Sequence, residues 1–198
     1  MNMMKKTQLS EELIEQILAS YDIGKHKDFS LVKRGSTHSN YVLITEKGRF
    51  ILRIFEERNL DQIFLEMKLL EKLSLTDIPT PNVIKTISGD FVISLNGKNV
   101  AIFSFLEGYH IDDEKKLTME QIREVGKYMG RFHKSLVGFK PKEVNSKHVY
   151  DREWVEIILG DLKKDFPDFP GDYEKYIFDI LDSISLPDDL PQGFNHGD

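Results

Sequence analysis

The sequence predicts an α+β protein built from two lobes. In its first half, short apolar segments alternate with polar residues as strands do, and two hairpin turns join them. One segment with helical periodicity interrupts these strands, and the second half shows apolar residues at helical spacing. We therefore expect an antiparallel sheet with one inserted helix over residues 1–105, and a helical lobe over residues 106–198.

The chain opens with a short amphipathic helix followed by three strands. Ser10 is a suitable N-cap, and apolar residues at helical spacing follow it until Gly24. Strand patterns cover residues 29–32, 41–45 and 50–55, with a hairpin turn at Glu46-Lys47-Gly48 between the last two. The expected order is thus helix, strand, strand, strand.

A helix over residues 60–73 interrupts the sheet, and further strands are expected after it. These strands cover residues 83–87, 91–95 and 100–105, and Asn96-Gly97 forms the hairpin between the last two. Helices are then expected from a capping box of Thr118 and Gln121 onward, and over residues 152–164 and 173–184. The change from strands to helices near residue 106 predicts the boundary between the lobes.

Arg53 and Glu66 form the most informative pair in the sequence. Alternation places Arg53 on the same strand face as Ile51 and Phe55. Helical periodicity places Glu66 at the centre of the apolar face of helix 60–73, where a carboxylate needs a cation as partner. We predict an ion pair between strand and helix. In the alternative interpretation, Glu66 reaches solvent at the helix edge and Arg53 is a charge on the rim of the sheet.

The polar segment from Arg34 to Asn40 has two interpretations. It has one glycine and several hydroxyl and amide side chains, which suits a solvated connection between strands. The same groups, together with exposed backbone N–H groups, could also cover the phosphates of a nucleotide. Composition alone favours the solvated connection.

Composition excludes several classes of function. The 27 basic and 33 acidic residues give a formal net charge of −6, and the basic residues are scattered, so we expect no nucleic-acid surface. There is no cysteine, hence no disulfide and no cysteine-based zinc site. No apolar segment is long enough for a signal sequence or a membrane span. We expect a soluble, cytoplasmic protein that does not bind membranes.

The order of these features resembles the protein-kinase-like phosphotransferases. It is most similar to the aminoglycoside phosphotransferase and choline kinase superfamily, whose catalytic loop reads His-Gly-Asp, as at residues 196–198. Further segments resemble the type II homoserine kinases. They are Tyr21-Asp22-Ile23-Gly24, Ser39-Asn40-Tyr41, Thr45, Gly48-Arg49-Phe50, Phe55-Glu56 and Leu190-Pro191-Gln192-Gly193.

The resemblance implies an ATP- and Mg²⁺-dependent transfer of the γ-phosphoryl group to a hydroxyl of a small molecule. It implies that Asp198 accepts the proton of the acceptor hydroxyl, and that Arg53 takes the place of the usual phosphate-binding lysine, with Glu66 orienting it. The implied nucleotide contacts are the phosphate loop of Ser36, Thr37, His38, Ser39 and Asn40, and the hinge of Phe103, Ser104, Phe105 and Glu107.

The sequence departs from the family pattern in three places. Arg53 replaces a lysine, Asn195 replaces an apolar residue, and the metal-binding Asn and Asp that follow the catalytic aspartate in the family have no counterpart. We therefore expect a truncated chain with an incomplete helical lobe and little or no catalytic activity.

Other functions remain open from the sequence. The acceptor could be homoserine, an aminoglycoside or another amino or sugar alcohol. A kinase-like module that binds nucleotide without chemistry is the alternative from another class. A metal-dependent hydrolase that uses His196 and Asp198 is less consistent with the sequence, because the other histidines lack paired ligand spacing.

Overall fold

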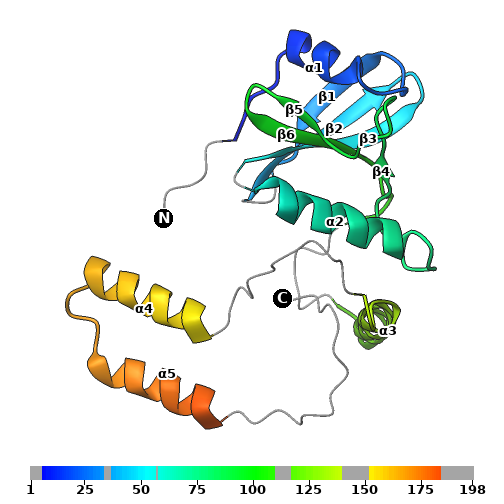
Figure 1. The fold of residues 1–198 in the computed structure, drawn as a ribbon. Helices are drawn as coiled ribbons and strands as arrows, with labels where there is room; N and C mark the ends of the chain where they lie inside the picture. The colour runs from blue at the N-terminus through cyan, green and yellow to red at the C-terminus, as the bar shows by residue number, and fades with distance from the viewer. Residues whose placement is uncertain (1–5, 34–36, 57, 110–116, 140–151, 184–198) are drawn as a thin grey trace. The chain divides into compact units, whose positions relative to one another are not determined.

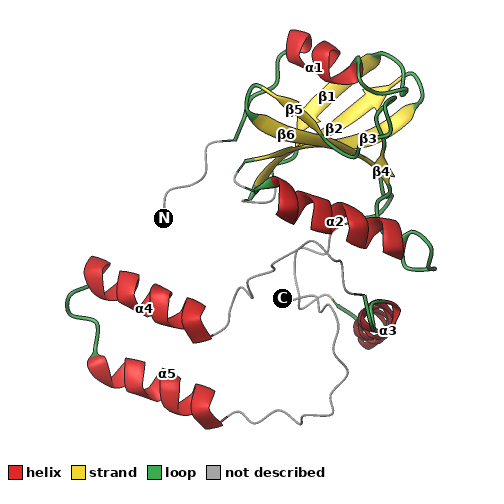
Figure 2. Ribbon diagram, viewed as in Figure 1, coloured by secondary structure: helices red, strands yellow, loops and turns green. Residues whose placement is uncertain are grey.

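In the computed structural model, residues 6–33, 37–56, 58–109, 117–139 and 152–183 are described, the side chains of residues 152–154 excepted. They fall into two compact units, one with the sheet and helices α1 to α3, the other with α4 and α5. All described strands precede α3, and only helices follow it (Figure 2). This order confirms the expected α+β class. The proposed lobe boundary near residue 106 stays a prediction.

Six strands form one antiparallel sheet in the first unit (Figure 1). They are β1 (His26–Leu31), β2 (His38–Thr45), β3 (Gly48–Phe55), β4 (Val83–Ile84), β5 (Ile93–Leu95) and β6 (Lys98–Ser104). Their order is β1-β2-β3-β6-β4, and β5 also pairs with β6. β6 therefore lies beside β3, which carries Arg53.

Five helices are described. They are α1 (Glu11–Leu18), α2 (Leu60–Leu73), α3 (Met119–Ser135), α4 (Arg152–Asp165) and α5 (Gly171–Ser183). Ser10 caps α1, and Thr118 and Gln121 form the expected capping box of α3. Asn59 and Gln62 form a second capping box at the start of α2. These local signals explain why the predicted helices agree closely with the structure. None of the helices described is long and apolar enough to cross a membrane.

The sheet carries a separate apolar core on each face, with α1 and α2 on opposite sides (Figure 1). On the α1 face, Ile14 and Ile17 pack against Leu43, Leu52 and other strand residues. On the α2 face, Ile63 and Met67 pack against a second set, Phe55, Ala101 and Phe103. Since alternate strand residues point to opposite faces, each polar residue of β2 and β3 belongs to one of these two environments.

Strand β2 begins earlier than the sequence pattern indicated. We expected a strand from Tyr41, preceded by a polar loop that extended to Asn40. In the structure, His38, Ser39 and Asn40 pair with Phe55, Ile54 and Arg53 of β3. Polar composition at the start of β2 therefore does not mean exposure to solvent, because His38 and Ser39 are both buried.

Candidate nucleotide site

Arg53 is held by two side chains on the α2 face of the sheet. Its Nε atom donates to Oδ1 of Asn40 at 2.9 Å, and its Nη1 atom lies 2.5 Å from Oε1 of Glu66. The predicted ion pair between β3 and α2 is therefore confirmed. Asn40 and Arg53 are directly opposite in the register of β2 and β3, which explains why the amide reaches the guanidinium.

Glu66 lies at the margin of the buried face of α2, and the expectation that it occupies the centre is wrong. The buried residues of α2 are Ile63, Met67 and Leu73, while the side chain of Glu66 remains 20% exposed. Because a carboxylate at the margin keeps some water, the pair avoids most of the cost of burying charge. The same position leaves Glu66 open to a second partner.

That second partner is Arg58, which the sequence interpretation missed. Its Nη1 atom lies 2.5 Å from Oε2 of Glu66, so the two carboxylate oxygens bind two different guanidinium groups. Arg58 precedes the N-cap Asn59, and the connection from β3 brings it back to the second turn of α2. In the sequence, the only indication of this contact is a cation directly before the helix that carries Glu66.

Aromatic rings support the guanidinium of Arg53. Its Cζ atom lies 4.9 Å from the ring centroid of Phe103 and 5.8 Å from that of Phe55. Both rings are buried in the core under α2. They limit the directions in which the guanidinium can point, and contribute a cation–π attraction. Arg53 is thus positioned before any ligand binds.

His38 occupies the same face of the sheet, beside this cluster. Its ring is 5.1 Å from the ring of Phe55, and the residue is only 8% exposed. Burial lowers the pKa of His38, and the positive charges of Arg58 and Arg53 lower this pKa further. Neither ring nitrogen has a hydrogen-bond partner among the described residues. The lowered pKa favours the neutral form of the imidazole, in which one ring nitrogen is a donor and the other an acceptor.

Ser39 faces the opposite side of the sheet and is not brought together with Arg53. Its hydroxyl donates to Oε1 of Glu56 at 2.5 Å and accepts from the backbone N–H of Thr7. Glu56 also binds the hydroxyl of Thr7 and the ammonium of Lys98. This second polar cluster ties the N-terminal segment to the sheet behind the Arg53 site.

The predicted hinge residues differ in whether their backbone groups already have hydrogen-bond partners. The N–H of Ser104 donates to the carbonyl of Asn82, and the ring of Phe103 is in the core. By contrast, no backbone hydrogen bond among the described residues involves Phe105 to Tyr109. Arg49 holds this segment by stacking over the ring of Phe105 at 4.4 Å and by an ion pair with Glu107.

The remaining predicted site residues are placed as follows. Thr37 is exposed and lies directly before β2. Ser36 and Asp198 lie outside the described residues, so the catalytic role of Asp198 stays a prediction. Among the residues described, no group of three or more His, Asp or Glu side chains could hold a metal ion.

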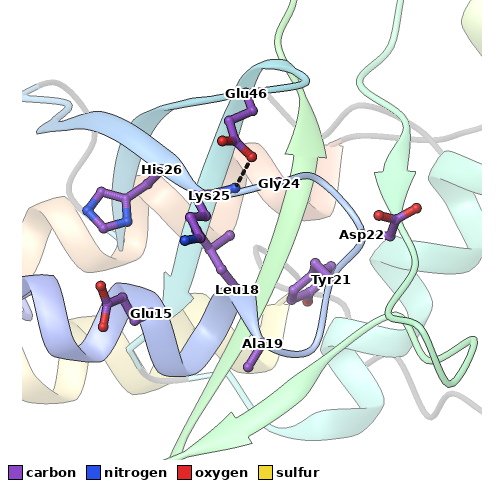
Figure 3. Close-up of a pocket in the computed structure, with 9 residues that line it drawn as sticks. All are labelled: Glu15, Leu18, Ala19, Tyr21, Asp22, Gly24, Lys25, His26 and Glu46. Atoms are coloured by element: carbon purple, nitrogen blue, oxygen red, sulfur yellow. Dashed lines mark hydrogen bonds between the residues drawn. The ribbon is translucent and has the colours of Figure 1, made fainter.

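A cavity of about 600 Å³ lies elsewhere, between α1, the segment after it and the β2–β3 turn (Figure 3). Its lining includes Glu15 and Asp22, and Oε2 of Glu46 accepts a hydrogen bond from the N–H of Lys25 there. None of the predicted site residues lines it. The converging charged groups of the Arg53 cluster favour the α2 face over this cavity as the candidate site.

The sequence also matches a known protein family. Residues 28–198 match the family described as "Phosphotransferase enzyme family". The chain belongs to this family. Sequence relatives include a homoserine kinase of Hyphomonas neptunium, 33% identical over 141 residues, which are 71% of this chain and 42% of that protein. A homoserine kinase of Caulobacter vibrioides is 29% identical over 195 residues, 97% of this chain and 60% of that protein.

Solved structures share the fold. Amicoumacin kinase hAmiN, in complex with AMP-PNP, Ca²⁺ and Ami, superposes with a TM-score of 0.69 at 16% identity over 90% of this chain and 55% of its own. Spectinomycin phosphotransferase APH(9)-Ia, in complex with ADP and spectinomycin, gives a TM-score of 0.58 at 18% identity with the same coverage. The two-lobed kinase-like fold class is thereby confirmed. The chain spans less than two thirds of the length of each of these four proteins.

Proposed function

We propose that the protein is an ATP-dependent phosphotransferase that transfers the γ-phosphoryl group to a hydroxyl of a small molecule, as homoserine kinases do. The main observation behind this proposal is the Arg53–Glu66 pair. In it, a cation on β3 is oriented by a carboxylate on α2 and supported by aromatic rings. Such a positioned cation suits phosphoryl transfer, where catalysis depends mainly on positioning and on neutralising charge. The family match and the homoserine kinase relatives support the same reaction.

In this proposal the nucleotide lies along the α2 face. The phosphates contact Arg53 and the segment Ser36 to Asn40, in which alternation places His38 and Asn40 on the same face of the sheet as Arg53. Ser39 contributes through its backbone, since its hydroxyl is bound to Glu56. Adenine pairs with the backbone of Phe105 to Glu107, and Asp198 receives the proton of the acceptor hydroxyl. Residues 1–105 thus form the nucleotide lobe.

Mg²⁺ enters this proposal only as the ion that accompanies ATP. When bound to the phosphates it neutralises their charge. The described residues offer no metal site of their own. Arg53 and its partners act on the nucleotide directly, by binding and orienting its phosphates.

The acceptor is the less constrained part of the function. The sequence relatives favour homoserine, whereas the solved neighbours are an amicoumacin kinase and a spectinomycin phosphotransferase. An aminoglycoside or another amino or sugar alcohol therefore stays the alternative acceptor. The alternative from another class is a kinase-like module that binds nucleotide without transfer.

Two measurements test the proposal. Calorimetric titration of the 198-residue chain with ATP and Mg²⁺ should show saturable binding, and its absence would contradict the nucleotide site. ADP release by the native gene product should depend on homoserine rather than on aminoglycosides, and Asp198→Ala should abolish it. Normal turnover by Asp198→Ala would refute the role of Asp198. Nucleotide binding without turnover on any hydroxyl acceptor would favour the non-catalytic module.

A further inference from the structure

Two cations bind Glu66, namely Arg53 and Arg58. Neither the sequence interpretation nor the family resemblance assigns a role to Arg58. Its side chain is 40% exposed, compared with 26% for Arg53 and 20% for the carboxylate between them. The three groups therefore form a row in which the negative charge is the least exposed member. Both positive charges retain access to solvent and hence to a ligand.

The charges of this row do not cancel. Two guanidinium groups share the single carboxylate of Glu66, and the other partner of Arg53, Asn40, is neutral. The row carries a net positive charge, which favours an anion beside it. A phosphate ligand would supply the second negative charge.

Both arginines keep N–H groups for such a ligand. Arg53 uses Nε and Nη1, and Arg58 uses Nη1, while no described residue accepts a hydrogen bond from Nη2 of Arg53 or from Nε and Nη2 of Arg58. A guanidinium presents several donors in a fixed plane, so it can bind a carboxylate on one edge and a phosphate on another. Glu66 thus orients two guanidinium groups whose remaining N–H groups can donate hydrogen bonds to a phosphate.

His38 gives an independent sign of a ligand at this place. It is more than nine-tenths buried, yet both of its ring nitrogens lack a partner in the described part of the chain. A buried polar group normally finds a hydrogen bond. The two arginines lie close enough to affect the ionisation of His38. His38 is thus a buried imidazole without a hydrogen-bond partner in the described residues, and it lies near both cations.

We propose that Arg58 is a second phosphate-binding cation, and that Glu66 holds Arg53 and Arg58 as a two-arginine clamp on the polyphosphate of the bound nucleotide. This inference rests on the proposed function, since it names a further residue of the same nucleotide site. It also accounts for the replacement of a lysine by Arg53. A lysine offers one compact charge, whereas two guanidinium groups can divide the oxygens of a polyphosphate between them.

The test is calorimetric titration of the 198-residue chain and its variants with two probes, Mg²⁺-ATP and adenosine. Arg58→Gln should weaken ATP binding by roughly tenfold or more, because a charge-assisted hydrogen bond is lost. Adenosine, which lacks phosphate, should bind with unchanged affinity. Lys72→Gln is the matched control, since it removes one positive charge from the last turn of α2. It should leave both affinities unchanged.

A double-mutant cycle separates direct contact from action through Arg53. If Arg58 touches phosphate, removing it in the Arg53→Gln background should still weaken ATP binding severalfold. If that loss disappears, Arg58 acts only through Glu66 and Arg53, and the inference is wrong. An equal loss of ATP and adenosine binding in Arg58→Gln would likewise overturn it, because that pattern indicates a merely structural role.

Arg58→Lys covers the case in which Arg58→Gln does not fold. This variant keeps the charge next to Glu66 but loses the planar donor set, so it should bind ATP more weakly than the unaltered chain and adenosine equally well. Equal ATP affinity of Arg58→Lys and the unaltered chain, with no folded Arg58→Gln, would contradict the clamp. If the unaltered chain binds neither adenosine nor ATP, the proposed function itself is wrong. ATP binding that is insensitive to Arg58 refutes only the clamp.

Discussion

The Nη1 atom of Arg53 and the Oε1 atom of Glu66 are 2.5 Å apart, at the edge of the apolar contact between β3 and α2. Inside this edge, Ile63 and Met67 pack on the sheet, and outside it lies solvent. The pair therefore joins two elements by charge where their apolar surfaces end. Because both groups are partly buried, its loss should affect stability more than the loss of a surface ion pair.

Glu66→Ala should lower the free energy of unfolding by about 1–3 kcal/mol, because it leaves two neighbouring guanidinium groups without their shared carboxylate. Urea denaturation followed by circular dichroism measures the change. Glu71→Ala is the matched control on the same helix. Glu71 is more exposed and lies 3.3 Å from Lys68 and from Lys85. The control should cost at most about 1 kcal/mol. Equal losses in the two variants would show that Glu66 is an ordinary surface charge.

The Arg53–Glu66 pair could be predicted because strand alternation and helical periodicity are local properties. Each periodicity assigns a residue to a face without knowledge of the rest of the chain. The helix caps at Ser10 and Thr118 were predictable for the same reason, since a cap binds backbone groups within three residues.

Features that depend on contacts between distant segments were not predictable. Ser39 is of a residue type common in loops, but its hydroxyl binds Glu56, which directly follows β3, and the backbone N–H of Thr7, which precedes α1. Arg58 reaches Glu66 only because the connection after β3 turns back. Polar composition cannot distinguish a solvated side chain from one with a distant partner, which explains why the start of β2 was misplaced.

Glu56→Gln should remove a pH-dependent part of the stability. Burial alone would raise the pKa of Glu56, but hydrogen bonds from Lys98, Ser39 and Thr7 outweigh it and hold the pKa at about 2. A depressed carboxyl pKa stabilises the fold above the unfolded value of about 4.3, and this contribution disappears as the pH falls towards the folded pKa. The variant should thus be less stable at pH 7 by about 2–3 kcal/mol.

Urea denaturation between pH 7 and pH 3 provides the measurement. The difference between Glu56→Gln and the unaltered chain should shrink below about pH 4, because the native carboxyl starts to lose its advantage there. Glu124→Gln is the control, since Glu124 forms an exposed pair with Lys127 within α3. It should change stability by less than about 0.5 kcal/mol at any pH. A difference for Glu56→Gln that stays constant with pH would contradict the buried-carboxylate interpretation.

His38 should report on the two arginines through its ionisation. Burial is the main cause of its lowered pKa, followed by the charges of Arg58 and Arg53. Replacing Arg58 with glutamine should therefore raise the pKa of His38, and Mg²⁺-ATP should raise it in the unaltered chain, because phosphate brings negative charge. Nuclear magnetic resonance titration of the imidazole protons measures both effects. A pKa of His38 that responds to neither change would place the ring outside the field of the cluster.

Adenine recognition should involve the backbone after β6 rather than β6 itself. The N–H of Ser104 is already bound to the carbonyl of Asn82 at 2.8 Å, so its hydrogen exchange should be slow without ligand. The amides of Phe105 to Glu107 have no backbone partner in the described residues, and they should exchange fast until adenosine or ATP binds. The amide of Gly97, in the turn at the other end of β6, is the internal control and should not respond.

Protection that appears at Gly97 as strongly as at Phe105 to Glu107 would indicate general tightening of the sheet. No change at Phe105 to Glu107 on saturation with ATP would remove this segment from the site, because an adenine held there must take its hydrogen bonds from these backbone groups.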